Sequence, residues 1–480
     1  MHDPEQRVVA SNHCGCFSRF RCARGSRREY VEVLDRVLGY HQTEEKGGRY
    51  NFFDSTGRCC ADECAQLGRI GKKLKMKRFK QALRDIARNK AVTRLFDQIE
   101  RTDDSPKRNS ESDFAFYNRS SIVAVAQVRA LMEDCVSRYP EKEVYELTKR
   151  LRSDNDQSFQ SAIFELILHD MLFRQGFTLI PHPKLPNGSS KRPDFLVTDS
   201  DGNTFYLEAV LATESNEQDA GGEVRKGVVF DALNDSPHQN FMVDVDDEGY
   251  PKSQSSGKKL VKAVHQWMDS LDPDEVQAKL ESEGDLYGIE PLEWCREDWV
   301  VRLRPIPIKP ERRGKTKTLI GIGSSGGGIV DSWSPICDAI RSKGNRYGEL
   351  DKPLLIAVNL NTFHLELIDE MQALYGQEQI VFEIGSEDKE HRMERAPSGA
   401  WFGKGGPQYT RVSGAWLFDG LRPSSIAKKN QTIYHNPWAA KALPESLNCF
   451  PHAVLLENKI QWKNGLSLAE VFSLSEQWPE

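Results

Sequence analysis

The spacing of apolar residues predicts several helices in the first half of the chain. Residues 158–175 read SFQSAIFELILHDMLFRQ, which predicts a helix that ends before Gly176, a residue suited to the left-handed turn after a helix. Residues 124–151 predict two helices broken before Pro140, because a residue that precedes proline disfavours helical backbone. A further helix is expected to begin near Lys258.

Runs of apolar and β-branched residues predict strands on both sides of that last helix. Before it lie FTLIP (177–181), a hairpin within 191–215 and FMVDVD (241–246). After it comes a second β-rich block, and strands mixed with helices of this length favour an α/β or α+β core. The runs of this block are WVVRLRPIPI (299–308), TLIGIG (318–323), PLLIAVNL (353–360), GAWLFDGL (414–421) and HAVLL (452–456), with the helix-like SWSPICDAIRSKG (332–344) before PLLIAVNL.

The hairpin KRPDFLVTDSDGNTFYLEAVLATES places two acids opposite each other. Its turn, DSDGN, has Gly202 where a residue with positive φ is needed, so Asp199 and Asn203 are expected to face each other. Their numbers sum to 402, as do those of Asp194 and Glu208. Without a bulge these two acids are cross-strand neighbours, with Cβ atoms about 4.5–5.5 Å apart.

Alternation along the second strand separates two faces. Tyr206 and Val210 share the face of Glu208, and the opposite face is expected to point into the core. That opposite face consists of Phe205, Leu207, Ala209 and Leu211.

Two like charges at this separation need compensation by a shared proton, a basic side chain or a metal. A pair of carboxylates suits Mg²⁺, which typically binds one or two carboxylates together with water and phosphate. Two alternatives stay open at this point: a bulge could turn the acids apart, or Arg192 could simply pair with Glu208.

The order of these residues resembles the PD-(D/E)xK nuclease superfamily. The matching pieces are Glu165 in FELILHD, Pro193 and Asp194 in RPDF, and Glu208 in YLEAV. The resemblance implies a restriction-endonuclease-like mixed sheet in α-β-β-β-α-β order, with a helical N-terminal region and a helical insertion. It also implies that the acids bind Mg²⁺ or Mn²⁺ for hydrolysis of DNA phosphodiester bonds. Residues 114–213 further resemble a bacterial subgroup that lacks the lysine of E-x-K.

The departure from the family pattern lies at Val210, which stands where that lysine is expected. One interpretation moves the lysine to the helix before PLLIAVNL, where Lys343 is the preferred candidate and Lys258, Lys262 and Lys226 are weaker ones. The other interpretation is a degenerate site that only binds nucleic acid or a protein partner.

The implied mechanism assigns a role to each group. Asp194 and Glu208 would hold the metal, Glu165 would orient water or bind a second metal, and Lys343 would stabilise charge on the phosphate. For Glu165 an alternative stays open, since Ser161, Glu165 and His169 share the spacing of a solvated helix face. Restriction or phage defence is the expected role, with RNA an open alternative substrate and a homodimer an open alternative assembly.

Composition adds limits to this picture. With 480 residues, 38% hydrophobic and 28% charged, the chain is expected to form two or three folded domains. No apolar run approaches the roughly 18–20 residues that cross a bilayer, and no signal peptide is seen, so a cytoplasmic protein is expected. Net charge is −6, yet residues 69–94 contain a basic stretch that a phosphate backbone or plain solvation would explain.

Cysteines are concentrated near the N-terminus, with six of the ten in the first 64 residues. Their spacing does not match paired C-x2-C knuckles, so free thiols are favoured over a structural Zn²⁺. The expected regions are 1–110 (Cys-rich, then basic), 111–215 (helical lead-in and first part of the core), 216–300 (insertion) and 301–480 (second part of the core).

Two further motifs are given structural interpretations. Gly321, Gly323 and Gly326 spell the dinucleotide-binding pattern G-x-G-x-x-G, but the following strand lacks the acid that binds ribose, so a glycine-rich loop is favoured. The aromatic residues of the irregular loop 433–444 (IYHNPWAAKALP) are expected to pack in a turn rather than to stack on bases.

Overall fold

The computed structural model describes residues 41–45, 49–53, 94–212, 220–284, 286, 288–321, 332–360, 365–382, 391–456 and 459–480. The chain divides into two compact units, Met1–Arg94 and Leu95–Glu480. In the first unit the hairpin β1 (His41–Glu45) and β2 (Arg49–Phe53) is described. The N-terminal cysteines, all but the last residue of the basic stretch, and Gly323 and Gly326 lie outside the described residues, as do the predictions made for them.

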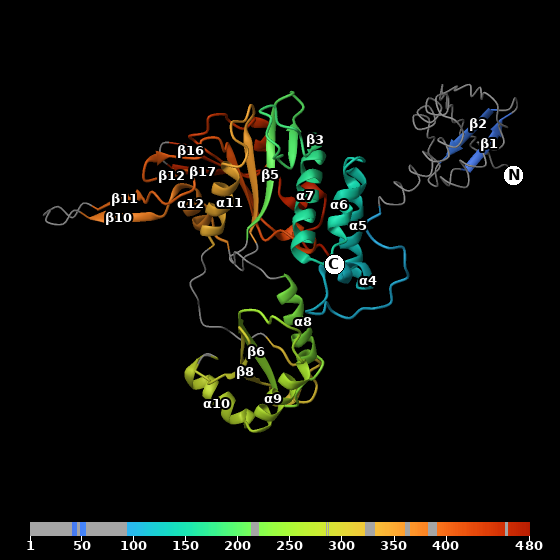
Figure 1. Cartoon of the computed structure of the whole chain (residues 1–480), viewed down its shortest axis with the longest axis vertical. Helices are drawn as coiled ribbons and strands as arrows, with labels where there is room; N and C mark the ends of the chain where they lie inside the picture. Colours follow the sequence, from blue (N-terminus) through green and yellow to red (C-terminus); the bar gives the residue numbers. More distant parts are fainter. Residues whose placement is uncertain are drawn as a thin grey trace, which may run out of the picture. The chain divides into compact units, whose positions relative to one another are not determined.

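An eight-stranded mixed sheet forms the centre of the second unit (Figure 1), which confirms the predicted α/β class. Its middle strands β5, β9 and β14 are parallel, because each is reached from the previous one by a helical crossover. Antiparallel strands flank them at both sides. The strand order is β17 (Lys459–Lys463), β16 (His452–Leu456), β15 (Gln431–His435), β14 (Gly414–Asp419), β9 (Leu354–Leu360), β5 (Thr204–Ala212), β4 (Phe195–Thr198), β3 (Thr178–Pro181).

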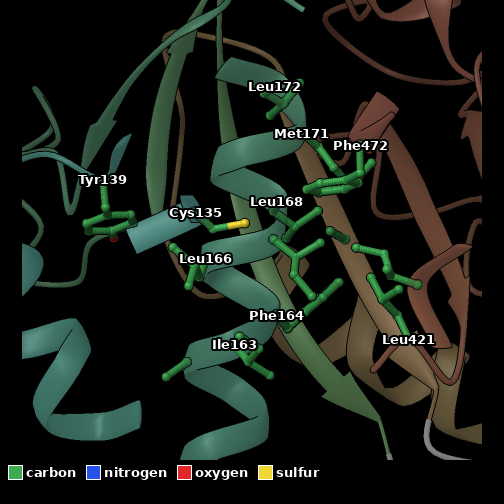
Figure 2. Packing of buried hydrophobic residues seen from close by; sticks show 14 of the residues in the cluster. Cys135, Tyr139, Ile163, Phe164, Leu166, Leu168, Met171, Leu172, Leu421 and Phe472 are labelled. Carbon is green, nitrogen blue, oxygen red and sulfur yellow. The ribbon is translucent and has the colours of Figure 1, made fainter. Parts of the chain in front are cut away.

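Apolar side chains cover both faces of this sheet. On one face α7 (Asp156–Arg174) packs against Phe205 and Leu207 of β5. Figure 2 shows apolar side chains on several sides of α7, which explains its nearly uniform hydrophobicity. On the other face α11 (Ser334–Gly344) and α12 (Leu367–Tyr375) pack against side chains that include Tyr206.

The helices predicted in the first half of the chain are confirmed. The α7 helix is followed by Gly176 with φ of 83°. The segment broken before Pro140 forms α5 (Val123–Arg138) and α6 (Val144–Leu151), and α4 (Asp113–Arg119) precedes them. Residues 95–110, which were assigned to the N-terminal region, belong to the second unit, because the backbone N–H groups of Leu95 and Phe96 donate to Glu133 of α5.

The insertion is larger than predicted. We expected WVVRLRPIPI to belong to the second part of the core, but it forms β8 (Trp299–Pro307) between β6 (Phe241–Glu248) and β7 (Leu292–Arg296) in a separate three-stranded sheet. Ile320 extends the same sheet by a bridge to Val243. Buried residues of this sheet, including Val301 and Leu303, pack against α9 (Gly257–Asp269), which forms near Lys258 as predicted.

Two further helices complete the insertion, α8 (Ala220–Asn234) and α10 (Pro273–Glu283). The remaining elements of the second unit all follow β8 in the chain. They are β10 (Glu378–Phe382), β11 (His391–Arg395), β12 (Phe402–Gly403), β13 (Gly406–Pro407), the 3-10 helices η1 (Pro310–Arg312), η2 (Pro423–Lys428) and η3 (Glu445–Cys449), and α13 (Leu468–Phe472). Within the described ranges, no helix has the length and apolar composition needed to cross a bilayer.

The aromatic segment 433–444 contributes to the core. Tyr434 lies in β15 rather than in a loop, and its hydroxyl donates to Glu370 of α12 over 2.6 Å. Asn436 bonds the carbonyl of Val412 and accepts from the backbone N–H of Trp438. The packed-turn interpretation therefore holds for the asparagine, while the tyrosine anchors a buried carboxyl group.

Glu370 gives the first prediction. Burial, and to a lesser degree the charges of Asp419 and Asp369, raise its pKa from 4.5 to about 7, against the opposing hydrogen bond from Tyr434. Because the folded-state pKa is the higher one, its contribution to stability is present below pH 4.5 and is lost as the pH rises to about 7. Glu370→Gln is expected to stabilise the protein by on the order of 2 kcal/mol more at about pH 8 than at about pH 5.

Urea unfolding of the wild type and the variant at both pH values measures this difference. Glu476→Gln, which changes an exposed carboxyl group, is the matched control. An equal effect of Glu370→Gln at both pH values would contradict the prediction.

Candidate active site

The β4–β5 hairpin has the predicted register. Phe195 pairs with Leu207 and Thr198 with Thr204, so each pair sums to 402. At the turn, the Asp199 N–H donates to the carbonyl of Asn203 over 3.0 Å. No bulge interrupts the pairing, and the bulge alternative is therefore wrong.

Asp194 directly precedes β4 and is tied to the neighbouring strand. Its Oδ2 accepts a hydrogen bond of 2.7 Å from the backbone N–H of Ala209, the residue that follows Glu208. The hairpin thus holds Asp194 beside the carboxylate position of β5, as the register requires.

Glu208 is more buried than the sequence indicated. We expected only the opposite face of β5 to be the core side, but the face of Glu208 is packed as well, against α11. The Glu208 residue is 3% exposed as a result. A carboxylate this deep needs partners for its oxygens, because burial without hydrogen bonds is costly.

Two side chains from the α11 region satisfy Glu208. Lys343 Nζ lies 2.6 Å from Glu208 Oε1, and the hydroxyl of Tyr347 donates to Oε2. The lysine therefore comes from the helix before β9, at the position preferred from the sequence. The pairing of Glu208 with Arg192 is wrong, since the exposed Arg192 donates to the carbonyl of His182.

Glu165 is held by a different cation. Both of its oxygens accept from Arg150 of α6, with Nη1–Oε1 at 2.6 Å and Nη2–Oε2 at 2.5 Å. Glu165 is 4% exposed and His169 is 2% exposed, so the interpretation of this side of α7 as a solvated face is wrong. His169 contributes to the core instead, with its ring 4.7 Å from that of Tyr139.

The charges of both Glu208 and Glu165 act on the carboxyl group of Asp194. Burial raises the pKa of Asp194 well above its ordinary value, and the charges of Glu208 and Glu165 raise it further. The N–H of Ala209 and the charge of Lys343 oppose this rise. Asp194 is therefore the acid whose negative charge is least compensated by the protein itself.

The three acids do not converge on one point. Glu208 lies on the side of the sheet covered by α11, whereas Glu165 belongs to α7, which packs on the other side. Among the described residues, no group of three or more His, Cys, Asp or Glu side chains could hold a metal ion. Mg²⁺ typically takes one or two carboxylates from a protein, and Asp194 and Glu208 are the two acids that could supply them, although Lys343 and Tyr347 bond the oxygens of Glu208.

The other lysines proposed from the sequence lie elsewhere. Lys226 pairs with Asp247 of β6 over 2.6 Å, and Lys258 and Lys262 are exposed on α9. Arg150 and Tyr347 were not predicted as site residues. The sequence indicated the position of Arg150 only indirectly, because Arg150 directly precedes Leu151, a buried residue of α6. Tyr347 follows α11 and carried no periodic signal.

No family model, no curated protein and no solved structure matches the chain. The interpretation of the site therefore rests on its own residues.

The Lys343–Glu208 pair gives a prediction about stability. Lys343→Met is expected to lower the free energy of unfolding by about 2–4 kcal/mol, because it leaves a buried carboxylate without its cation. In a Glu208→Gln background, where position 208 carries no charge, the same substitution should cost less than about 1 kcal/mol.

Urea unfolding of the wild type, both single variants and the double variant measures this coupling. Lys404→Met is the control, since Lys404 is exposed and forms no ion pair with a described residue. Equal costs of Lys343→Met in both backgrounds would show that the contact does not contribute to stability.

Proposed function

We propose that this protein is a metal-dependent endonuclease that hydrolyses DNA phosphodiester bonds, built on a restriction-endonuclease-like core. Two features of the second unit support the proposal. The elements α7, β3, β4, β5, α11 and β9 follow one another in the α-β-β-β-α-β order of that fold, with the insertion between β5 and α11. The acidic positions of the motif lie on α7, directly before β4, and on β5. Restriction or phage defence is the role we propose for this activity.

The observation that carries the proposal is the contact between Lys343 and Glu208. The two residues are 135 positions apart in the chain, yet their side chains meet at 2.6 Å. The family pattern places a lysine two residues after this glutamate, where Val210 stands here. A lysine supplied by α11 would restore the missing positive charge beside the acids.

Each side chain has a role in the proposed hydrolysis. The bound metal would polarise the phosphate and activate water. Asp194 and Glu208 would hold the ion. The Lys343 ammonium group would stabilise negative charge on the phosphate, and Tyr347 would keep Glu208 in place through its second oxygen.

A basic segment of the insertion supports DNA as the substrate. Between β8 and Ile320, the side chains of Lys309, Arg312, Lys315 and Lys317 are exposed. In the described part of the chain, none of these four forms an ion pair with an acid. Such free cations suit a phosphate backbone, where they release condensed counterions on binding.

A second candidate function is a catalytically inactive module that binds nucleic acid or a protein partner. The observation in its favour is that Glu165 and Glu208 already have a partner for every oxygen: Arg150 for the first, Lys343 and Tyr347 for the second. Such a network is stable without a metal. The two functions differ in whether DNA is cut.

The proposal is tested by incubating plasmid DNA with the purified full chain and Mg²⁺ or Mn²⁺. We expect metal-dependent cleavage that is abolished by Asp194→Asn and by Glu208→Gln. Lys343→Met should reduce the rate about 100-fold or more, since it removes a charge that stabilises the transition state. Asp201→Asn, which changes an exposed acid in the turn of the same hairpin, should leave the rate unchanged.

Two outcomes would contradict the proposed endonuclease activity of this site. DNA binding without cleavage at any metal concentration would favour the inactive module. Cleavage that persists in both acid variants would assign the activity to another site or to a contaminant.

A further inference from the structure

Arg150 occupies a position next to Glu165 where a cation is required. Glu165 is buried on α7 and would carry an uncompensated charge without a partner. The guanidinium meets both carboxylate oxygens at once, the strongest geometry for such a pair. Both carboxylate oxygens of Glu165 are thereby bonded to a cationic side chain of the protein.

The guanidinium keeps donors for another ligand. An arginine has five N–H donors, and Arg150 uses two of its nitrogens, Nη1 and Nη2, on Glu165. Among the described residues, no other acceptor bonds it. Its side chain is 35% exposed, in contrast to the 6% of the Glu165 side chain.

Arg150 also lies within electrostatic range of the proposed metal site. The bonds to Glu165 are the main cause that raises the pKa of Arg150, and the charge of Asp194 contributes to the same rise. Tyr139, whose pKa is raised chiefly by burial, is influenced by both Glu165 and Asp194 as well. The charges of Arg150 and Asp194 therefore influence each other.

We propose that Arg150 takes the place of a second divalent ion, so that the centre binds one ion at Asp194 and Glu208 while Arg150 binds a phosphate oxygen. This inference rests on the proposed function, and it assigns Glu165 a positioning role instead of the metal-binding role expected from the sequence. A planar guanidinium is well suited to this task, because it binds carboxylate and phosphate oxygens with paired N–H groups.

The geometry explains why one ion is expected. A second ion at Glu165 would have to displace Arg150 from both oxygens of a buried carboxylate. It would also need further acidic ligands, and no third acid joins Asp194 or Glu165 in a metal-binding group within the described residues. At Asp194 and Glu208 the situation differs in one respect. Lys343 and Tyr347 bond the oxygens of Glu208, but the neighbouring Asp194 forms no ion pair with a described cation and offers a second carboxylate.

Titration of the full chain with Mn²⁺, followed by electron paramagnetic resonance of the free ion, counts the bound ions without any need for activity. We expect one Mn²⁺ per chain for the wild type and the same number and affinity, within about twofold, for Glu165→Gln. Glu208→Gln should lose the ion. Arg150→Gln, which frees the oxygens of Glu165, should bind a second Mn²⁺, and the double variant Arg150→Gln with Glu165→Gln should return to one.

The possible results separate the two proposals. Two ions bound to the wild type, loss of the ion in Glu165→Gln, or a single ion in Arg150→Gln would overturn the role of Arg150 and leave the endonuclease proposal intact. No ion bound to the wild type would overturn both. If Arg150→Gln does not fold, the double variant, which replaces the pair by two neutral groups, and Glu165→Gln still decide the question.

A separate measurement tests the proposed contact of Arg150 with a phosphate oxygen. DNA affinity in the presence of a chelator is compared between Glu165→Gln, which keeps Arg150, and the double variant, which lacks it. We expect the double variant to bind about five- to tenfold more weakly, as suits the loss of one charge-assisted hydrogen bond at a partly exposed site. Equal affinities would overturn the phosphate role of Arg150.

Discussion

The site depends on one constraint: two carboxylates are held next to each other on adjacent strands inside a sheet that is covered on both faces. A tight turn fixes the register of β4 and β5, and Asp194 and Glu208 are the next residues beyond the pair of Phe195 with Leu207. Apolar layers on both faces keep solvent away from Glu208. Their mutual repulsion therefore has to be balanced by groups of the protein, by a proton or by a metal.

The rest of the fold supplies these balancing groups from distant parts of the chain. The crossover from β5 to β9 brings α11 over the sheet, and with it Lys343 and Tyr347. On the other side, α6 packs against α7 and brings Arg150 to Glu165. Asp194 has no described cation within ion-pair distance. Burial, and then the charges of Glu208 and Glu165, raise its pKa. Of the three acids, Asp194 is therefore the one whose charge a divalent ion would compensate most.

Local patterns were enough to predict the hairpin and the main helices. Turn chemistry at Gly202 and the two-residue period of a strand determine which side chains of β4 and β5 face each other. The break before Pro140 and the end of α7 at Gly176 likewise follow from backbone preferences of single residues. Lys343 was preferred because of the family resemblance, not because of any local pattern.

The parts that were missed depend on contacts between distant segments. An apolar run such as β8 is equally suited to either sheet, and only its pairing with β6 assigns it to the insertion. The burial of Glu165 and the identity of its partner Arg150 depend on how α6 meets α7. Glu208 was expected on an open face, because periodicity identifies the two faces of a strand but does not tell whether a helix covers the second one.

The most direct test of the central claim is a crystal structure of the full chain grown with Mn²⁺, with an anomalous difference map at the metal edge. The account predicts one peak, coordinated by the carboxylates of Asp194 and Glu208, with Lys343 on the α11 side and Glu165 still bound by Arg150. A peak at Glu165, or a structure in which Asp194 and Glu208 point to opposite faces of the sheet, would contradict it.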